Sequence, residues 1–482
     1  MSGFRWTAGE VERALETGPG EGGDIGFAEV STDTRKIAPG ALFVALQGAN
    51  FDGHDYLARA AEAGATGAVV SRIPHGAPAL RYFVVENTLH ALGKLGRHRR
   101  RALAGKVVAV AGSNGKTTTK DLLRAALSST LRVHATAANL NNQVGAPQTL
   151  LAAPDDAEVV VVEVGTNEPG EIAILGAIVE PDLALITSIG EEHLEGLGSV
   201  EGVLEEEIAI LRHVRGGGPA LVADEPAELP ERAREIVGAP RLRIAGFGEE
   251  ADLRPDGGSE GIEVLPKGAS RWGFRGTRID LPLPGRHNVR NALLALGVAA
   301  ELGVPLEDAA RGIAAMPVPK MRSEWRRVGT LGVLADCYNA NPPSTLAAVD
   351  LLASVPATGE KVAVVGTMRE LGAHAEALHR SVAATIAAKV GEGIDRVVAT
   401  GDFVPAFAEH EGRLGERLIA ADDPLAAYER LRPVLRGDET ILLKGSRGVA
   451  LERLIPLLER DFAGAAESGS SDDAMSTASA GA

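Results

Sequence analysis

The segment from Val107 to Leu123 reads VVAVAGSNGKTTTKDLL, and it predicts the fold of the region around it. A buried strand is expected first, because VVAVA is a continuous apolar run, as in parallel sheets that are covered on both faces. A tight glycine turn and the amphipathic start of a helix follow. A strand, a glycine turn and a helix in this order are typical of α/β domains that bind phosphate groups.

The turn departs from the full phosphate-loop pattern, because Val110 stands where that pattern has its first glycine. The physical basis of the site is nevertheless retained. Gly112 and Gly115 permit close approach of the backbone, and successive N–H groups at a helix start form an anion site. Lys116 would add positive charge for the terminal phosphates, and the Thr117 hydroxyl could bind Mg²⁺. We therefore predict a nucleotide loop, made of Gly112, Ser113, Asn114, Gly115, Lys116, Thr117 and Thr118.

Two further polar residues follow apolar runs that are also expected to be strands of this sheet. Glu163 ends the run at 159–165, and His193 comes just after the run at 183–190. Ligands of α/β sheets gather at the carboxyl ends of parallel strands. A lone buried carboxylate requires a compensating charge, which Mg²⁺ would supply. The alternatives are a Glu that faces solvent and a structural His.

Apolar runs elsewhere predict two more α/β units. Short runs at 41–46, 67–71 and 81–86 indicate a small N-terminal sheet, and the helix of the central unit is expected from His287 to Leu302. Further runs that each end in a polar or glycine turn predict a second doubly wound pattern, at 332–344, 361–368, 396–402 and 440–446. The predicted fold is thus α/β with three domains: a small N-terminal α/β domain at 1–104, a central phosphate-loop domain with a mostly parallel sheet at 105–318, a Rossmann-like C-terminal domain at 319–462, and a disordered tail at 463–482.

Composition and charge exclude several classes of protein. The chain of 482 residues has a formal net charge of −16, which disfavours sequence-independent binding of nucleic acid. The single cysteine, Cys337, excludes an internal disulfide and is expected to be structural. No apolar run reaches the roughly 20 residues that a membrane helix needs. We expect a cytoplasmic protein without membrane insertion, and we expect His374 and His379 to be exposed.

Several segments together resemble the Mur ligases, which build the peptide stem of peptidoglycan. The resemblance covers about residues 25–460. The segments that carry it are GSNGKTTTK, TAANLNNQVGAPQTLL, VVEVGTNEPGEI, EEHLEGLGSVEGV, GRHNVRNALLA, DCYNANPPS, VVGTMRELG, LLKGSRG and, near the N-terminus, STDTRKIAPGALFVALQGANFDGHDY.

The resemblance implies ATP-dependent formation of an amide bond through an acyl phosphate, with two Mg²⁺ sites. The chain looks most like the branch that adds D-Ala-D-Ala to UDP-MurNAc-tripeptide, with the N-terminal domain binding UDP. The resemblance also implies a monomer, and it leaves open whether the third stem residue is diaminopimelate or lysine. One alternative is the branch that adds this third residue, although its Asp-Asn-Pro-Arg tetrad is missing here. Another is a nucleotide-gated binding protein without ligase activity.

The resemblance also implies roles for individual residues. The predicted catalytic residues are Lys116, Glu163, His193 and Glu207, and the predicted metal ligands are Thr117, Glu163, His193 and Glu207. Beyond the loop, the predicted ATP contacts are Asn288, Arg322 and Asp336. The predicted contacts with the nucleotide-sugar substrate are Thr34, Arg35, Asn139, Asn141 and Asn142.

One of these residues departs from the family pattern. Family members carry a carbamoylated lysine at the position that aligns with Glu207, and this chain has no lysine between Lys120 and Lys267. A glutamate offers the same pair of anionic oxygens on a shorter arm, so we expect Glu207 to bind the metal directly. The alternative is that residues 205–207 form a solvated helix face. The segment before Arg322 also departs from the usual glycine-arginine pair.

Overall fold

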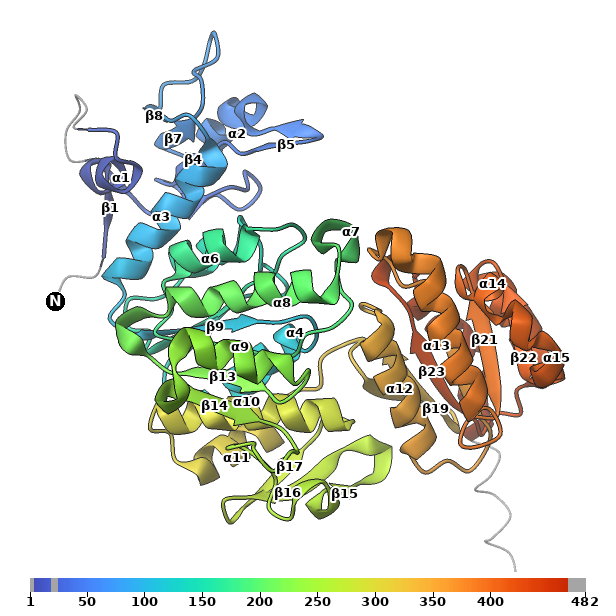
Figure 1. Ribbon diagram of the computed structural model, residues 1–482. Helices are drawn as coiled ribbons and strands as arrows, with labels where there is room; N and C mark the ends of the chain where they lie inside the picture. Colours follow the sequence, from blue (N-terminus) through green and yellow to red (C-terminus); the bar gives the residue numbers. More distant parts are fainter. Residues whose placement is uncertain (1–3, 19–24, 467–482) are drawn as a thin grey trace, which may run out of the picture. The chain divides into compact units, whose positions relative to one another are not determined.

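The computed structural model describes residues 4–18 and 25–466 (Figure 1). The chain divides into two compact units. The first comprises 1–189, 204–253 and 293–312, and the second comprises 190–203, 254–292 and 313–482. Of the predicted tail, Ala463–Ala466 form a 3-10 turn, and the rest lies outside the described residues.

The N-terminal sheet belongs to the first unit and is parallel throughout, in the order β3-β4-β7-β8. Its strands are β3 Val30–Ser31, β4 Leu42–Val44, β7 Gly67–Val70 and β8 Arg81–Val84. The helices beside it are α1 Ala8–Leu15, α2 Leu57–Glu62 and α3 Thr88–Ala102. Three of these strands coincide with the predicted apolar runs, so the small α/β unit is confirmed.

The central sheet is also parallel throughout, in the order β10-β11-β9-β12-β13-β14. Its strands are β9 Lys106–Ala111, β10 Val133–Ala135, β11 Val159–Glu163, β12 Leu183–Ile186, β13 Ala220–Ala223 and β14 Leu242–Ala245. Glu163 of β11 pairs with Val110 of β9, and Ile186 of β12 pairs with Ala111. The carboxyl ends of these three strands therefore meet at one edge of the sheet, as the sequence predicted.

Helices connect the central strands (Figure 1). They are α4 Lys116–Leu127, α5 Gly145–Leu151, α6 Glu171–Val179, α8 Val200–Ile208 and α9 Glu228–Val237, whereas α10 Arg286–Glu301 and α11 Leu306–Ala314 come after the last of these strands. Helix α10 matches the predicted helix to within one residue at each end. A three-stranded antiparallel sheet precedes α10 and was not predicted; it consists of β15 Glu263–Val264, β16 Ser270–Phe274 and β17 Thr277–Leu281.

The C-terminal sheet, in the second unit, has the order β18-β19-β23-β20-β21-β22. It is mixed, because edge strand β18 runs antiparallel to β19 whereas the other pairs are parallel. The strands are β18 Glu324–Val328, β19 Leu331–Asp336, β20 Lys361–Val365, β21 Arg396–Thr400, β22 Leu418–Ala421 and β23 Thr440–Lys444.

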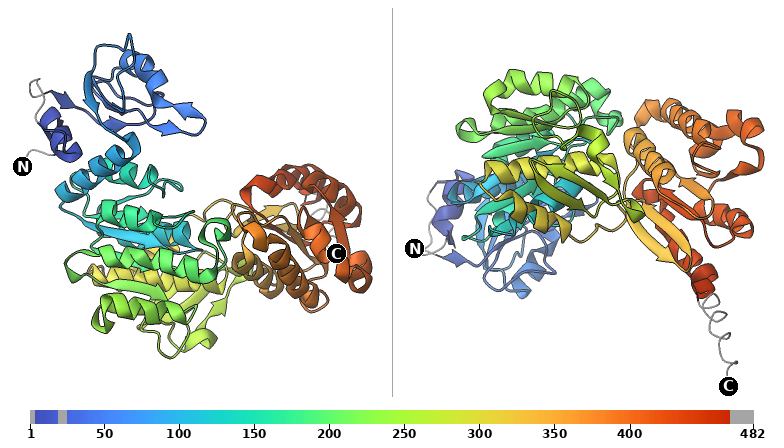
Figure 2. Two further views of the ribbon diagram at one scale, coloured as in Figure 1. Left: turned by 45° about the horizontal axis from the view of Figure 1, so that its top comes forward. Right: turned by 90° about the horizontal axis from the view of Figure 1, so that it is seen from below.

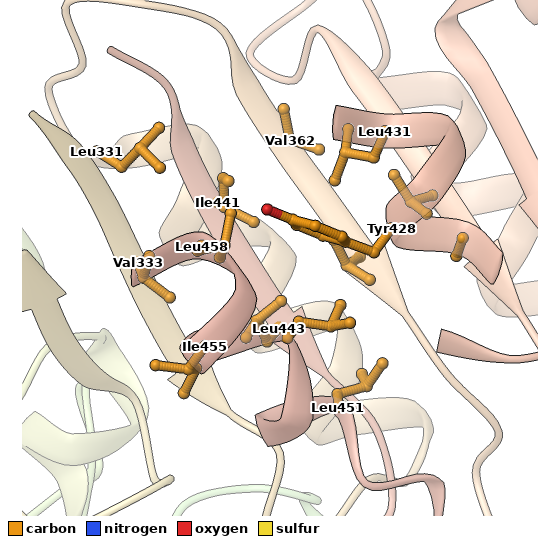
Figure 3. Packing of buried hydrophobic residues seen from close by; sticks show 14 of the residues in the cluster. Leu331, Val333, Val362, Tyr428, Leu431, Ile441, Leu443, Leu451, Ile455 and Leu458 are labelled. Atoms are coloured by element: carbon orange, nitrogen blue, oxygen red, sulfur yellow. The ribbon is translucent and has the colours of Figure 1, made fainter. Parts of the chain in front are cut away.

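Helices cover both faces of the C-terminal sheet (Figure 2). On one face, Val333, Ile441 and Leu443 of the strands pack against Tyr428 and Leu458 of the helices (Figure 3). The helices of this domain include α12 Pro342–Ser354, α13 Ala375–Lys389, α16 Pro424–Leu431 and α17 Leu454–Phe462.

Two predictions from composition concern the whole of the described chain. Cys337 is a buried free cysteine, and burial raises the pKa of its thiol to about 12, in agreement with a structural role. Within residues 4–18 and 25–466, no helix has the length and apolar character needed to cross a membrane.

Candidate active site

The predicted phosphate loop joins β9 to α4. Gly112 has φ +116°, and a Cβ there would lie 2.5 Å from the Thr187 hydroxyl oxygen, so only glycine fits. Gly115, with φ +87°, occupies the cap position of α4 and has no side chain to offer to the helix N-terminus. Ser188 holds the loop from β12, because its carbonyl accepts from Ser113 N–H (2.8 Å) and its hydroxyl accepts from Asn114 N–H (3.0 Å).

Side chains of the first turn of α4 line this loop. The Lys116 ammonium donates to the carbonyls of Gly112 and Ser113, so its positive charge lies against the loop itself. Thr117 donates its hydroxyl to Glu163, whereas Thr118 is buried. The loop therefore brings N–H groups, an ammonium and a hydroxyl together at the end of a buried strand. This is the chemistry that a triphosphate requires.

Glu207 supports the loop from α8. Its Oε2 accepts from Gly112 N–H at 2.7 Å, and its side chain is buried. Its neighbour Glu206 is buried too and accepts from the N–H groups of Gly170 and Ile172 at the start of α6 (both 2.7 Å). The alternative of a solvated helix face is thus wrong for both residues. Only Glu205 lies at the surface, where it pairs with Arg232.

Glu163 is buried at the end of β11, and its two oxygens have different surroundings. Oε1 accepts from the Thr117 hydroxyl (3.1 Å) and from the Asn141 amide (3.0 Å). Oε2 is fully buried and has no hydrogen-bond partner within the described ranges. The ammonium of Lys120 lies 3.9 Å from this oxygen. A buried anionic oxygen without a hydrogen bond next to a threonine hydroxyl fits the oxygen ligand set of Mg²⁺.

Lys120 was not among the predicted site residues. Its side chain is 4% exposed and donates to the Ala138 carbonyl at 2.9 Å. Its place one turn after Lys116 on α4 could have indicated it, because residues four apart share a helix face.

The three predicted asparagines lie in the segment before α5, and they differ in what they contact. Asn141 reaches Glu163, whereas the Asn142 side chain accepts from the N–H groups of Val144 (3.1 Å) and Gly145 (3.0 Å) and so shapes the turn. The Asn139 carbonyl accepts from Asn141 N–H at 2.8 Å.

The predicted N-terminal residues lie in a turn after β3. Arg35 is exposed and forms two hydrogen bonds of 2.8 Å with Asp33, which lower the pKa of that carboxyl group. Thr34 lies in the same turn and is half-buried. Thr32, just before the turn, accepts from Gln148 of α5 at 2.6 Å. This turn therefore adjoins the helix that follows the asparagine segment.

His193 belongs to the second unit. It adopts a left-handed conformation with φ +51°. Its Nδ1 lies 2.8 Å from Oε2 of Glu370, and its Nε2 lies 3.3 Å from Oε1 of Glu192. Among the described residues, no group of three or more His, Cys, Asp and Glu side chains is arranged to hold a metal ion.

The half-buried Asp336 and the buried Lys444 form an ion pair at the carboxyl edge of the C-terminal sheet. The Lys444 ammonium is 2.9 Å from Oδ2 of Asp336 and also donates to the Asn339 carbonyl. Oδ1 accepts from Ser323 N–H at 3.1 Å. Arg322 stacks on the Tyr338 ring at 4.1 Å. Lys444 was not among the predicted site residues, because its partner lies far away in the chain.

The predicted adenine contact, Asn288, is buried near the start of α10. Its amide donates to the Pro284 carbonyl at 2.7 Å and accepts from Asn291 at 3.2 Å. Burial lowers the pKa of the neighbouring His287 to about 4.

One prediction about histidines is wrong. His379, expected at the surface, is buried on α13. Its Nε2 accepts from Met368 N–H at 2.9 Å, and its Nδ1 lies 2.7 Å from the Ala375 carbonyl. The ring thus fixes the turn after β20, because it satisfies a backbone group that would otherwise be buried without a partner.

Three parts of the chain match known protein families. Descriptions of the Mur ligase family match its catalytic domain at 27–100, its middle domain at 110–299 and its glutamate ligase domain at 321–447.

Relatives match over most of their length. The UDP-N-acetylmuramoyl-tripeptide--D-alanyl-D-alanine ligase of Bacillus subtilis is 35% identical over 88% of this chain and 92% of its own. That of Escherichia coli is 36% identical over 92% and 96%. A crystal structure of MurF from Acinetobacter baumannii superposes with a TM-score of 0.83 at 32% identity and covers 95% of this chain and 100% of its own. MurF from Thermotoga maritima, solved with ADP, gives 0.77 at 26% identity, over 90% and 97%. With a phosphate loop, a buried strand-end glutamate and such relatives, the chain belongs to the Mur ligase family.

Proposed function

We propose that the protein is an ATP-dependent ligase that joins D-Ala-D-Ala to UDP-MurNAc-tripeptide and so makes the pentapeptide precursor of peptidoglycan. The observation that carries this proposal is the pairing of the β9–α4 loop with the buried Glu163, in a chain whose full-length relatives bear that ligase name. A protein with this activity acts in the cytoplasm, where nucleotide-linked precursors are made.

The chemistry proceeds in two steps. A carboxylate oxygen at the end of the tripeptide attacks the γ-phosphorus of ATP, and ADP leaves as an acyl phosphate forms. The amine of D-Ala-D-Ala then attacks the acyl carbon, loses a proton and expels inorganic phosphate, which leaves the amide. Both steps depend chiefly on positioning and on neutralising the charge of the phosphoryl oxygens.

The loop supplies the phosphate site. Its N–H groups and the start of α4 would face the β- and γ-phosphates, and the Lys116 ammonium, already held at the loop, would stabilise the oxygens of the transferred group. Glu207 keeps Gly112 N–H in place and so preserves the shape of the loop. The predicted contacts of Ser113, Asn114, Gly115 and Thr118 with the nucleotide belong to this same site.

The residues present also fit a divalent cation. Oε2 of Glu163 is buried without a hydrogen bond in the described chain, and the Thr117 hydroxyl lies against the same carboxylate. Mg²⁺ bound by these two residues would neutralise charge on the phosphates. His193 and Glu207 are the residues we propose for a second Mg²⁺.

The remaining predicted residues complete the substrate sites. Thr34, Arg35 and the asparagines Asn139, Asn141 and Asn142 would contact the nucleotide-sugar peptide, since the Thr32–Gln148 hydrogen bond joins these two segments. Asn288 would contact adenine, and Arg322 and Asp336 would approach the ribose and phosphates. We further propose that domain 1–104 binds the UDP substrate, that domain 105–318 binds ATP, and that domain 319–462 is the Rossmann-like ligase domain.

The test is ATP-dependent release of phosphate together with the mass of the product. The expected product is UDP-MurNAc-pentapeptide, formed only when ATP, UDP-MurNAc-tripeptide and D-Ala-D-Ala are all present. Product from UDP-MurNAc-dipeptide and a single amino acid would instead identify the enzyme that adds the third residue. ATP binding without phosphate release under any of these conditions would indicate a binding protein.

A further inference from the structure

We infer that Glu370 is a positioning residue for His193: its carboxylate fixes the imidazole by Nδ1 and aims Nε2 at a divalent cation. The inference rests on the metal role of His193 proposed above. Glu370 follows β20 in the segment VVGTMRELG, and it was not among the predicted site residues.

The geometry is that of a carboxylate–histidine pair. Oε2 of Glu370 lies 2.8 Å from Nδ1, so the Nδ1 proton is directed to Glu370. The other ring nitrogen faces Glu192 at 3.3 Å. An imidazole between two carboxylates requires positive charge, which either a second ring proton or a cation at the Nε2 side supplies. Histidines that bind metals usually donate their other N–H to a carboxylate in this way.

His193 and Glu370 both adopt left-handed backbone conformations, which are unusual for residues other than glycine. His193 has φ +51° and Glu370 has φ +65°, in the left-handed region that is unfavourable for side chains with a Cβ. The Glu370 side chain is 56% exposed, and ion pairs with exposed partners contribute little to folding. Because this ion pair contributes too little stability to account for the two unfavourable backbone conformations, they indicate a functional constraint.

The two segments are held together on the backbone as well. Glu195 N–H donates to the Glu370 carbonyl at 3.3 Å. Gly372 has φ +53°, and a Cβ there would lie 2.9 Å from Cα of Glu195, so the two segments approach too closely for any residue other than glycine. Helix α7 Leu194–Leu197, directly after His193, therefore lies against the 3-10 turn η7 Gly372–His374.

The turn that carries Glu370 is itself anchored on both sides. His379 accepts from Met368 N–H at 2.9 Å, and the Ser446 hydroxyl accepts from Arg369 N–H at 3.0 Å. Glu370 thus reaches His193 from a fixed backbone. This is what a residue needs if it is to orient a metal ligand rather than follow it.

The experiment measures Mn²⁺ binding to the full-length protein with saturating ADP, from the electron paramagnetic resonance signal of free Mn²⁺. Glu370→Ala should weaken one Mn²⁺ site by about 10- to 100-fold, because that is the usual effect of removing a carboxylate behind a metal-binding histidine. Glu370→Gln, which keeps an acceptor but loses the charge, should give a smaller loss. The matched control is Glu376→Gln, since Glu376 is exposed and pairs only with Arg380 within the described chain; it should bind Mn²⁺ like the parent.

A double-mutant cycle separates this inference from the proposed function. Glu370→Ala should have no further effect in a His193→Ala background, because it acts through that ring. Parent-like Mn²⁺ affinity of Glu370→Ala, or an equal loss in the His193→Ala background, would overturn the positioning role. If His193→Ala itself left Mn²⁺ binding unchanged, the metal role of His193 and this inference would both be overturned, whereas ligation at the phosphate loop would still stand. Circular dichroism establishes that each variant is folded.

Discussion

The helix that follows β9 in the central domain and the helix that follows β19 in the C-terminal domain differ in how their N-termini are capped. In the central sheet, β9 leads through Gly115 into α4, and the cap position has no side chain. In the C-terminal sheet, β19 leads to Asn341, whose side chain accepts from Ser344 N–H at 3.0 Å, while the Ser344 hydroxyl accepts from Asn341 N–H. One helix start has no side-chain cap, and the other is satisfied by the protein's own capping box.

The carboxylates at the two sheet edges also differ in how closely a cationic side chain approaches them. Asp336 has the ammonium of Lys444 at 2.9 Å. Glu163 has a buried oxygen with no hydrogen bond in the described chain, and the ammonium of Lys120 lies 3.9 Å from that oxygen. Similar α/β architecture therefore yields two kinds of edge. The C-terminal edge holds its carboxylate in a direct ion pair, whereas the ammonium beside the carboxylate at the central edge lies at 3.9 Å, which suits the cation site proposed above.

The largest effect is expected from Lys116→Ala, which removes the ammonium that lies against the phosphate loop. The rate of ligation should fall by about 10³-fold, because the ammonium stabilises charge that develops on the phosphoryl group. The measurement is product formation at saturating ATP. Lys106→Ala is the control, since its side chain is 64% exposed and lies at the start of the same strand. Parent-like ligation by Lys116→Ala would show that the two edges do not differ in function.

The next largest effect compares one chemical change at both edges. Asp336→Asn leaves the buried Lys444 without its counter-charge and should destabilise the C-terminal domain by about 3 kcal/mol. Glu163→Gln removes a charge that has no hydrogen bond at Oε2 within the described chain, so stability should be unchanged or higher, while the Mg²⁺ requirement for ligation rises.

Hydrogen–deuterium exchange followed by mass spectrometry reads both effects locally, in β23 for Asp336→Asn and in β11 for Glu163→Gln. Equal loss of protection in the two variants would remove the distinction between the edges.

The central edge is readily predicted from the sequence because its signals are local. The apolar runs of β9 and β11 and the glycines of the loop lie within short segments, so the sequence alone places Lys116 and Glu163 at one edge of the sheet. The sequence indicated a functional role for Glu207 but left open whether its side chain is buried or solvated. A run of three glutamates is usually solvated, and only tertiary packing reveals that Glu206 caps α6 and that Glu207 holds Gly112.

The C-terminal edge is harder to predict because its contacts are remote in the chain. Lys444 meets Asp336 across 108 residues, and nothing near either residue indicates the pair. Strand β18, EWRRV, was missed because it is an edge strand rich in charge and therefore forms no apolar run. His379 was expected at the surface because an isolated histidine near a helix gives no sign that it will accept a backbone N–H.

A smaller effect should appear in the pH dependence of stability. Burial holds the pKa of His287 near 4 in the folded protein, against 6.5 in an unfolded chain. The unfolded state therefore takes up this proton first, and stability present above pH 6.5 is lost as the pH falls towards 4. His287→Gln should reduce that loss by about 3 kcal/mol at pH 4.

Urea unfolding of the parent and of His287→Gln at several pH values measures the difference. Asp336 acts to raise this pKa and Lys444 to lower it, so the result also reports on the charge balance of the C-terminal edge. Identical pH profiles for the two proteins would contradict the prediction.

The smallest effect tests the capped helix. Asn341→Ala removes the side chain that accepts from Ser344 N–H and should destabilise the C-terminal domain by about 1 kcal/mol, because an N-cap contributes about that much. Asn341→Asp keeps an acceptor at the same position and should retain most of the stability. Exchange protection in α12 is the measurement, and ATP affinity should not change in either variant. A loss of ATP affinity with unchanged protection would mean that this helix start, like that of α4, serves a ligand rather than the fold.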